Sequence, residues 1–157
     1  MIAIIAVLAA VAVPQYMRFQ LKSKCAEAKA NLAAIRNAEA AHFSEFGTYV
    51  SAAPTPAGIP GSSPGPFAPV TAGFDELGFQ ATGRVFFSYA VALAPDGTGY
   101  TAEAAADLDG DGAIQYWAFP VAPAAGPLVP AAIGCDVTNL VASQIGPCDP
   151  AFGQSVF

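Results

Sequence analysis

Hydrophobic and polar positions divide the chain into segments of different period. Residues 1–13 carry no charged or polar side chain. Between Pro14 and Gly47, apolar residues recur every three or four positions, the pattern of a helix with one buried face. Glu39 is the one interruption of this stripe, which comprises Leu21, Cys25, Ala28, Leu32, Ile35, Phe43 and Phe46. We predict one long helix that is kinked near Pro14, which lacks an N–H, and that ends at Gly47, a residue suited to the left-handed C-terminal position.

The remainder of the chain changes to the period of strands. Residues 51–73 are rich in Pro, Gly and Ser and predict a long variable loop. The run FDELGF (74–79) predicts a short helical turn. Alternating segments at 84–93, 100–106 and 113–119, joined by PDGTG and DLDGDG, predict an antiparallel meander within residues 84–120. The fold class is therefore α+β, with the long helix packed on a small antiparallel sheet of three to four strands.

The apolar run at residues 1–13 is too apolar for water and too short to span a membrane by itself. At ~1.5 Å per helical residue it is roughly 20 Å long, too short for a bilayer core of about 30 Å. A secretory signal peptide needs basic residues before its apolar core, whereas here they all follow it.

Charge is distributed unevenly along the chain. Residues 1–36 hold five basic residues and one acid, and the rest holds Arg84 against eleven acids. An acidic body makes nucleic acid an unsuitable partner, because phosphate binding needs a clustered positive surface. The basic segment after the apolar run favours a membrane-proximal flank instead. On the helix, Lys22, Lys29 and Arg36 repeat every seven residues and form their own stripe.

The three cysteines cannot all pair within one chain. Cys135 and Cys148 flank a Pro/Gly-containing tail, where a disulfide would stabilise the fold by about 3 kcal/mol and imply an oxidising compartment. The alternatives are two free thiols or, less favoured, a zinc site. Cys25 lies on the apolar stripe, where a buried thiol is the simplest interpretation and an intermolecular disulfide the alternative.

Candidate chemistry is sparse. Asp107, Asp109 and Asp111 have the spacing of the first half of a calcium loop, although the twelfth position is not a glutamate. The alternative is a hairpin turn, since Asp-Gly is a common tight-turn dipeptide. We expect no enzyme, because His42 is the one histidine and neither a phosphate loop nor a nucleophile elbow occurs.

The opening AIIAVLAAVAVPQYMRF, Ala3 to Phe19, closely resembles the N-terminal segment of type IV pilins and the related pseudopilins. Residues 19–49 look like its continuation in pilins of the delta-proteobacterial kind. The resemblance implies a filament subunit whose residues 1–17 form a membrane anchor and then a filament core, with residues 18–157 as the globular head. The filament-core interface it implies comprises Ile2, Ile4, Ile5, Val7, Leu8, Val11, Val13, Pro14 and Tyr16.

The resemblance carries further expectations. Partners would be other copies of the chain, the pilus assembly machinery and the inner membrane before assembly; the mature pilus would be extracellular, serving functions such as adhesion or motility. Pilins of this family begin with a methylated residue and an early glutamate, which alignment on Pro14 would place upstream of Met1. About eight further apolar residues would bring the run close to the ~20 that span a bilayer. Thr55, Ser62 and Ser63 are candidate O-glycan sites.

Two other functions remain open from the sequence. One is a type II secretion pseudopilin, which a calcium site would favour. The other is an exported membrane-tethered binding domain, in which the apolar segment serves as an address alone.

Overall fold

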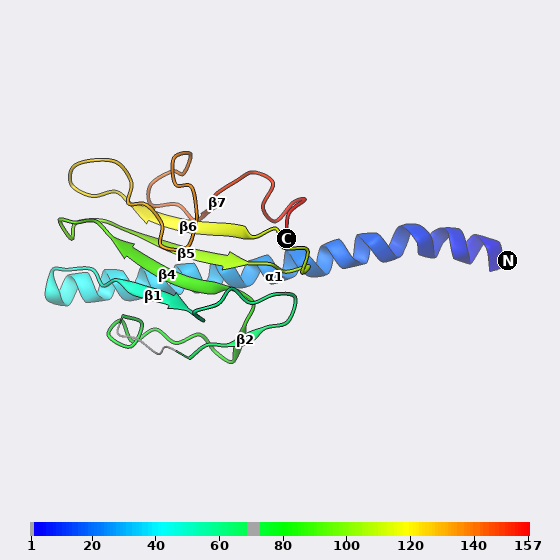
Figure 1. Cartoon of the computed structure of the whole chain (residues 1–157), viewed down its shortest axis with the longest axis horizontal. Helices are drawn as coiled ribbons and strands as arrows, with labels where there is room; N and C mark the ends of the chain where they lie inside the picture. The colour runs from blue at the N-terminus through cyan, green and yellow to red at the C-terminus, as the bar shows by residue number, and fades with distance from the viewer. Residues whose placement is uncertain (1, 69–72) are drawn as a thin grey trace.

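A computed structural model describes residues 2–68 and 73–157 of the chain. The described residues form one long helix and a head built on a twisted sheet (Figure 1). The elements are α1 (Ile2–Phe46), β1 (Ala52–Thr55), β2 (Gly65–Pro66), β3 (Arg84–Val85), β4 (Ser88–Leu93), β5 (Tyr100–Ala106), β6 (Gln115–Val121) and β7 (Gly146–Pro147). The predicted α+β class, with a long N-terminal helix on an antiparallel sheet, is confirmed.

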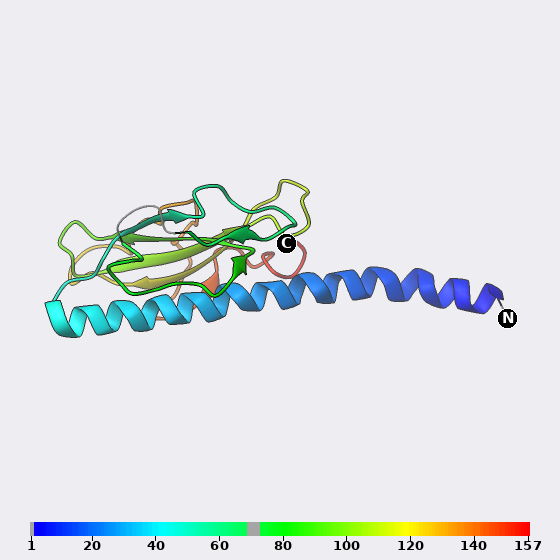
Figure 2. The same ribbon diagram turned by 90° about the horizontal axis from the view of Figure 1, so that it is seen from below.

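Helix α1 is continuous over 45 residues and includes Pro14. A single proline removes one main-chain hydrogen bond, and the turns on both sides of Pro14 remain helical. The expected kink is therefore not a break, and the helix curves gently in its N-terminal part (Figure 2). It ends as predicted at Gly47, which has a φ of 73° and donates its N–H to the Phe43 carbonyl at 2.8 Å.

The main sheet has five strands in the order β1-β4-β5-β6-β7, whereas the sequence indicated three to four. The predicted meander is confirmed, because β4, β5 and β6 pair consecutively and antiparallel. Strand β1 lies inside the segment predicted to be a loop. Its Pro54 cannot donate a ladder hydrogen bond, but β1 is an edge strand, where proline is tolerated. Residues 69–72 of that loop lie outside the described residues.

The strand predicted at 84–93 is interrupted in the structure. Strand β3 pairs with β2 in a separate two-stranded ribbon, and β4 starts at Ser88. Between them, the N–H groups of Phe86 and Phe87 donate to Oε1 of Glu27 on α1, at 2.9 and 3.4 Å. These two donors bond the helix rather than a neighbouring strand, so the ladder breaks here. The turn predicted at 74–79 is confirmed by the hydrogen bond from Leu77 N to the Gly73 carbonyl.

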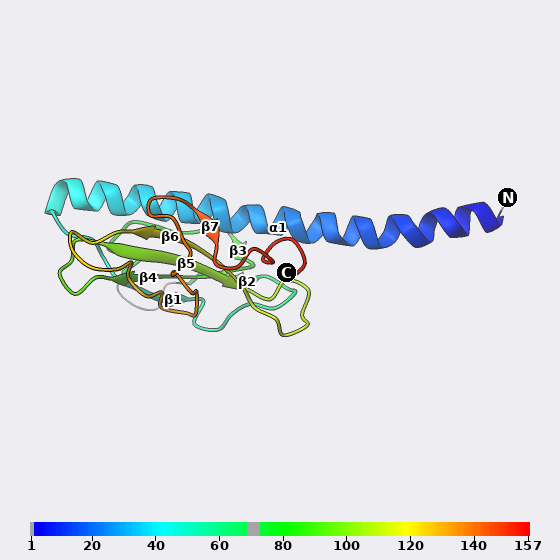
Figure 3. The same ribbon diagram turned by 90° about the horizontal axis from the view of Figure 1, so that it is seen from above.

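The C-terminal part of α1 packs on one face of the sheet, so the head has two layers (Figures 2 and 3). Leu32 and Ile35 share a core cluster with Tyr100, Ala102 and Ala104 of β5. Alternate residues of β5 face the other side of the sheet, where the segment after β6 covers them. Both faces of β5 are therefore covered, which explains why all seven of its residues are buried.

The apolar stripe predicted on α1 is buried where the helix lies against the sheet. Cys25, Ala28, Leu32 and Ile35 are buried, and Leu21 is partly buried against the core. Phe43 and Phe46 were expected on the same buried face, but they are 41% and 62% exposed. The reason is that the last turns of α1 have no sheet beneath them, and Phe43 stacks on Tyr49 instead, with ring centroids 4.5 Å apart.

Candidate functional site

The first half of α1 projects beyond the head (Figure 3). We call residues 3–19 the exposed half-helix, because every one of them is exposed. Its large side chains are between 57% and 66% exposed; they are Ile4, Ile5, Val7, Leu8, Val11, Val13, Tyr16, Met17 and Phe19. Pro14 is exposed as well. The side chain of Ile2, the remaining member of the predicted filament interface, lies outside the described residues.

An apolar surface of this length in water is unusual for a monomer and marks an association surface. Among the described residues, α1 is long and apolar enough, by length and composition, to cross a membrane. None of its most apolar stretch is buried within the chain itself. The predicted interface residues therefore lie together on one element, and no other described segment of the chain covers them.

Basic residues begin where the half-helix meets the head. Lys22 donates to the Gln154 side chain at 3.3 Å, and Lys24 lies 4.5 Å above the Phe86 ring. Farther along, Lys29 lies 4.7 Å above the Trp117 ring, and Arg36 lies 5.6 Å from the Phe119 ring centre. The charged stripe predicted from Lys22, Lys29 and Arg36 thus runs along the edge of the helix–sheet contact, where two of its cations, Lys29 and Arg36, meet aromatic faces.

The disulfide between Cys135 and Cys148 is present, with Cα atoms 5.6 Å apart. It closes a loop beside β6 and β7, and both cysteines are buried against Ala118. Cys25 is the free thiol among the described residues, and it is buried as predicted. Its Sγ donates to Oε1 of Gln115 at 3.3 Å, and burial raises the pKa of the thiol.

A carboxylate that the sequence analysis did not single out holds the disulfide region in place. Glu103 of β5 is fully buried, and its two oxygens accept N–H groups from Ile133, Gly134 and Cys135 at 2.6, 2.8 and 2.6 Å. Charge-assisted bonds of this kind are about twice as strong as neutral ones. The sequence does contain a sign of this role, because Glu103 is the one charged residue in the strand YTAEAAA.

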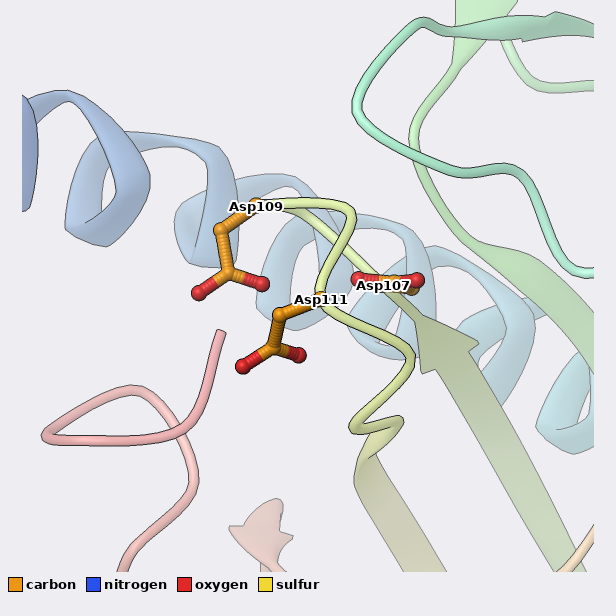
Figure 4. Close-up of side chains that lie close together, drawn as sticks. All are labelled: Asp107, Asp109 and Asp111. Atoms are coloured by element: carbon orange, nitrogen blue, oxygen red, sulfur yellow. The ribbon is translucent and has the colours of Figure 1, made fainter.

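The three aspartates of the predicted calcium loop lie on the β5–β6 connection (Figure 4). One oxygen from each lies within 4.8 Å of the others. Asp107 accepts the N–H groups of Gly110 and Gly112, and Asp111 accepts that of Ala113, so the loop also has the bonding of a hairpin turn. Partial burial, followed by repulsion from the other two carboxylates, raises the pKa of Asp109.

The candidate glycan residues differ in accessibility. Ser62 and Ser63 are exposed, whereas Thr55 is 4% exposed and donates its hydroxyl to the Ala53 carbonyl at 3.1 Å. The geometry therefore favours the two serines over Thr55 as acceptors. His42, the one histidine of the sequence, places Nδ1 at 2.8 Å from the Thr48 carbonyl and Nε2 at 3.7 Å from a Glu76 oxygen.

Comparison with known proteins gives a partial relation. The chain is 48% identical over 48 residues to the type IV major pilin protein PilA of Myxococcus xanthus strain DK1622. The matched stretch is 31% of this chain and covers 22% of the relative's length. No protein-family model matches the chain, and no solved structure matches it. The similarity thus supports a pilin-like relation over part of the chain.

Proposed function

We propose that this chain is the structural subunit of an extracellular type IV pilus and polymerises through its exposed half-helix. The observation that carries the proposal is the exposed half-helix itself, which has no polar side chain before Gln15 and no charge before Arg18, and which no described part of the chain covers. The partial similarity to a protein named a type IV major pilin supports the same function.

Assembly would remove this surface from water by packing it against other copies. Burial of apolar area contributes about 25 cal/mol per Å². Side chains such as Ile5, Leu8 and Val11, each about two-thirds exposed in the single chain, would supply most of that area. Before assembly, the same surface would lie in the inner membrane, with Arg18, Lys22 and Lys24 at the headgroups. The assembly machinery would then move the helix from lipid into the fibre.

The acidic head would form the outer surface of the fibre. The disulfide and the Glu103 bonds stabilise the head independently of the half-helix, since both lie on the sheet. The proposal therefore requires that a change in the half-helix affect assembly and leave the head folded.

Leu8→Asp tests this requirement. The substitution places a carboxylate in the middle of the apolar surface, where burial of an unpaired charge is strongly unfavourable. We expect wild-type fibres in the material sheared from cells and no fibres from the variant. Ser44→Asp is the matched control, because it adds the same charge to an exposed position of α1 beside the head.

The head of each variant is checked by its disulfide and by the fluorescence of Trp117, which is buried on β6. Fibres containing the Leu8→Asp chain would refute assembly through the half-helix. Recovery of the wild-type chain in membranes and never in fibres would instead favour a membrane-tethered domain. Short fibres that form only when a type II secretion system is present would favour a pseudopilin.

A further inference from the structure

Three glutamates of the head accept main-chain N–H groups, and one of them is incompletely bonded. Glu27 accepts the N–H groups of Phe86 and Phe87 and the Tyr89 hydroxyl, and Glu103 accepts three N–H groups. Glu39 is fully buried, yet its Oε2 accepts one N–H, from Val50 at 3.0 Å. Its Oε1 has no partner among the described residues.

Glu39 lies where the chain leaves α1 and enters the sheet. Its Oε2 accepts the Val50 N–H from the segment that follows α1, and the charges of His42 and Glu76 act on its carboxyl. The titratable and charged groups that act on this region are Arg36 and His42 on α1, Tyr49 after the helix, Glu76 in the turn and Tyr100 on β5. His42 is engaged by Glu76 at 3.7 Å. No described Lys or Arg lies within 4.0 Å of the Glu39 carboxyl.

A cleft borders the segment whose N–H bonds Glu39. A cleft of about 280 Å³ is lined by Tyr49, Val50, Ser51, Gly73, Glu76 and Leu93. The turn packs so closely on the chain entering β1 that a Cβ at Gly73 would overlap the Ser51 carbonyl oxygen. The residue that bonds Glu39, Val50, is part of the cleft wall, so separation of the turn from residues 50–52 would let water reach the carboxyl.

We infer that Glu39 is a proton-operated latch on residues 47–52, the junction between α1 and β1. The neutral carboxyl keeps the junction closed, and the carboxylate opens it to water. This device belongs to the head and does not depend on filament formation.

The physical cause is the cost of burying a charge with one hydrogen bond. Burial raises the pKa of Glu39 from 4.5 to about 7, with the nearby Glu76 charge acting in the same direction and the Val50 N–H and His42 opposing it. A carboxyl that holds its proton more tightly in the closed state stabilises that state at low pH. The stabilisation is complete below about pH 4.5 and is lost as the pH rises through about 7.

Hydrogen–deuterium exchange of the full chain in detergent micelles tests the latch. After correction for the intrinsic pH dependence of exchange, protection of residues 47–52 should fall about thirtyfold between pH 5.5 and 8.5 if the opened carboxylate is fully hydrated. Glu39→Gln should abolish this dependence. Glu27→Gln is the matched control, because it removes a second glutamate side chain that accepts main-chain N–H groups, at a different contact, and should leave the dependence at 47–52 intact.

Unchanged protection of residues 47–52 across this pH range in the wild-type chain would overturn the latch, as would the same pH dependence in Glu39→Gln. Glu76→Gln provides a second test that does not disturb the core, because the Glu76 side chain is 59% exposed. Removing this negative charge should lower the pH at which the junction opens. A midpoint that stays in place or moves upward would contradict the assignment to Glu39.

Discussion

Glu103 offers the sharpest quantitative prediction about the head. It lies at 0% exposure on the central strand β5 and joins this strand to residues 133–135. Glu103→Ala would leave three buried main-chain donors without an acceptor. Glu103→Gln would keep an oxygen for Gly134 and Cys135 but would turn an NH₂ group toward the Ile133 N–H.

The expected costs follow from these contacts. A buried donor left without a partner costs about 1–3 kcal/mol, and such costs are not additive within one cluster. We therefore expect Glu103→Ala to lower the free energy of unfolding by about 4 kcal/mol and Glu103→Gln by about 2 kcal/mol. Domains are stable by only about 5–15 kcal/mol, so the alanine variant should be close to unfolding at ambient temperature.

Urea unfolding of the full chain in a mild detergent, followed by Trp117 fluorescence, measures these costs. Trp117 is the single tryptophan and pairs with Ala104 and Pro147, so it reports on the strand next to Glu103. Glu45→Ala, at an exposed position of α1, is the control and should cost less than about 0.5 kcal/mol. A loss below about 1 kcal/mol for Glu103→Ala would show that its three bonds do not hold the C-terminal region.

Three further outcomes are expected. Replacing Cys148 by Ser should lower the free energy of unfolding by about 3 kcal/mol, measured by the same urea titration, because it releases the loop closed with Cys135; an unchanged midpoint would contradict this. If the aspartate loop binds calcium, the melting temperature should be higher in calcium than in chelator, and Asp109→Asn should remove the difference; identical melting curves for the wild-type chain would end the calcium hypothesis. Ser62 and Ser63 should carry any O-glycan, so an intact mass equal to that of the bare sequence would exclude glycosylation.

The helix and the meander could be predicted because their apolar periods are long and regular. Strand β1 could not, because Pro54 argues against a strand unless its edge position is known. The spacing of apolar residues also shows which face of a helix is buried, but it does not show how far along the helix the sheet that covers this face extends. For this reason Phe43 and Phe46 were placed on the buried face, although the sheet does not reach them.

The polar interior of the head was the least predictable part. Glu39 interrupts the apolar stripe and Glu103 interrupts a strand of small residues, and both are fully buried. A charged residue at a position whose neighbours are buried is the sequence sign that would have identified them. Their partners, however, are main-chain N–H groups eleven and about thirty residues away along the chain, which no local pattern identifies.

The exposed half-helix was foreseen as the candidate interface, and the structure places its described side chains on the surface of the single chain. No described part of the chain covers them. The sequence resemblance and the partial relative both favour other copies of the chain.

Electron cryomicroscopy of fibres sheared from cells that express the chain tests whether the exposed half-helix forms a fibre core. We expect fibres composed of this chain, with residues 3–19 packed together at the fibre axis and the sheets on the outside. Fibres that lack this chain, or fibres in which residues 3–19 face solvent, would contradict it.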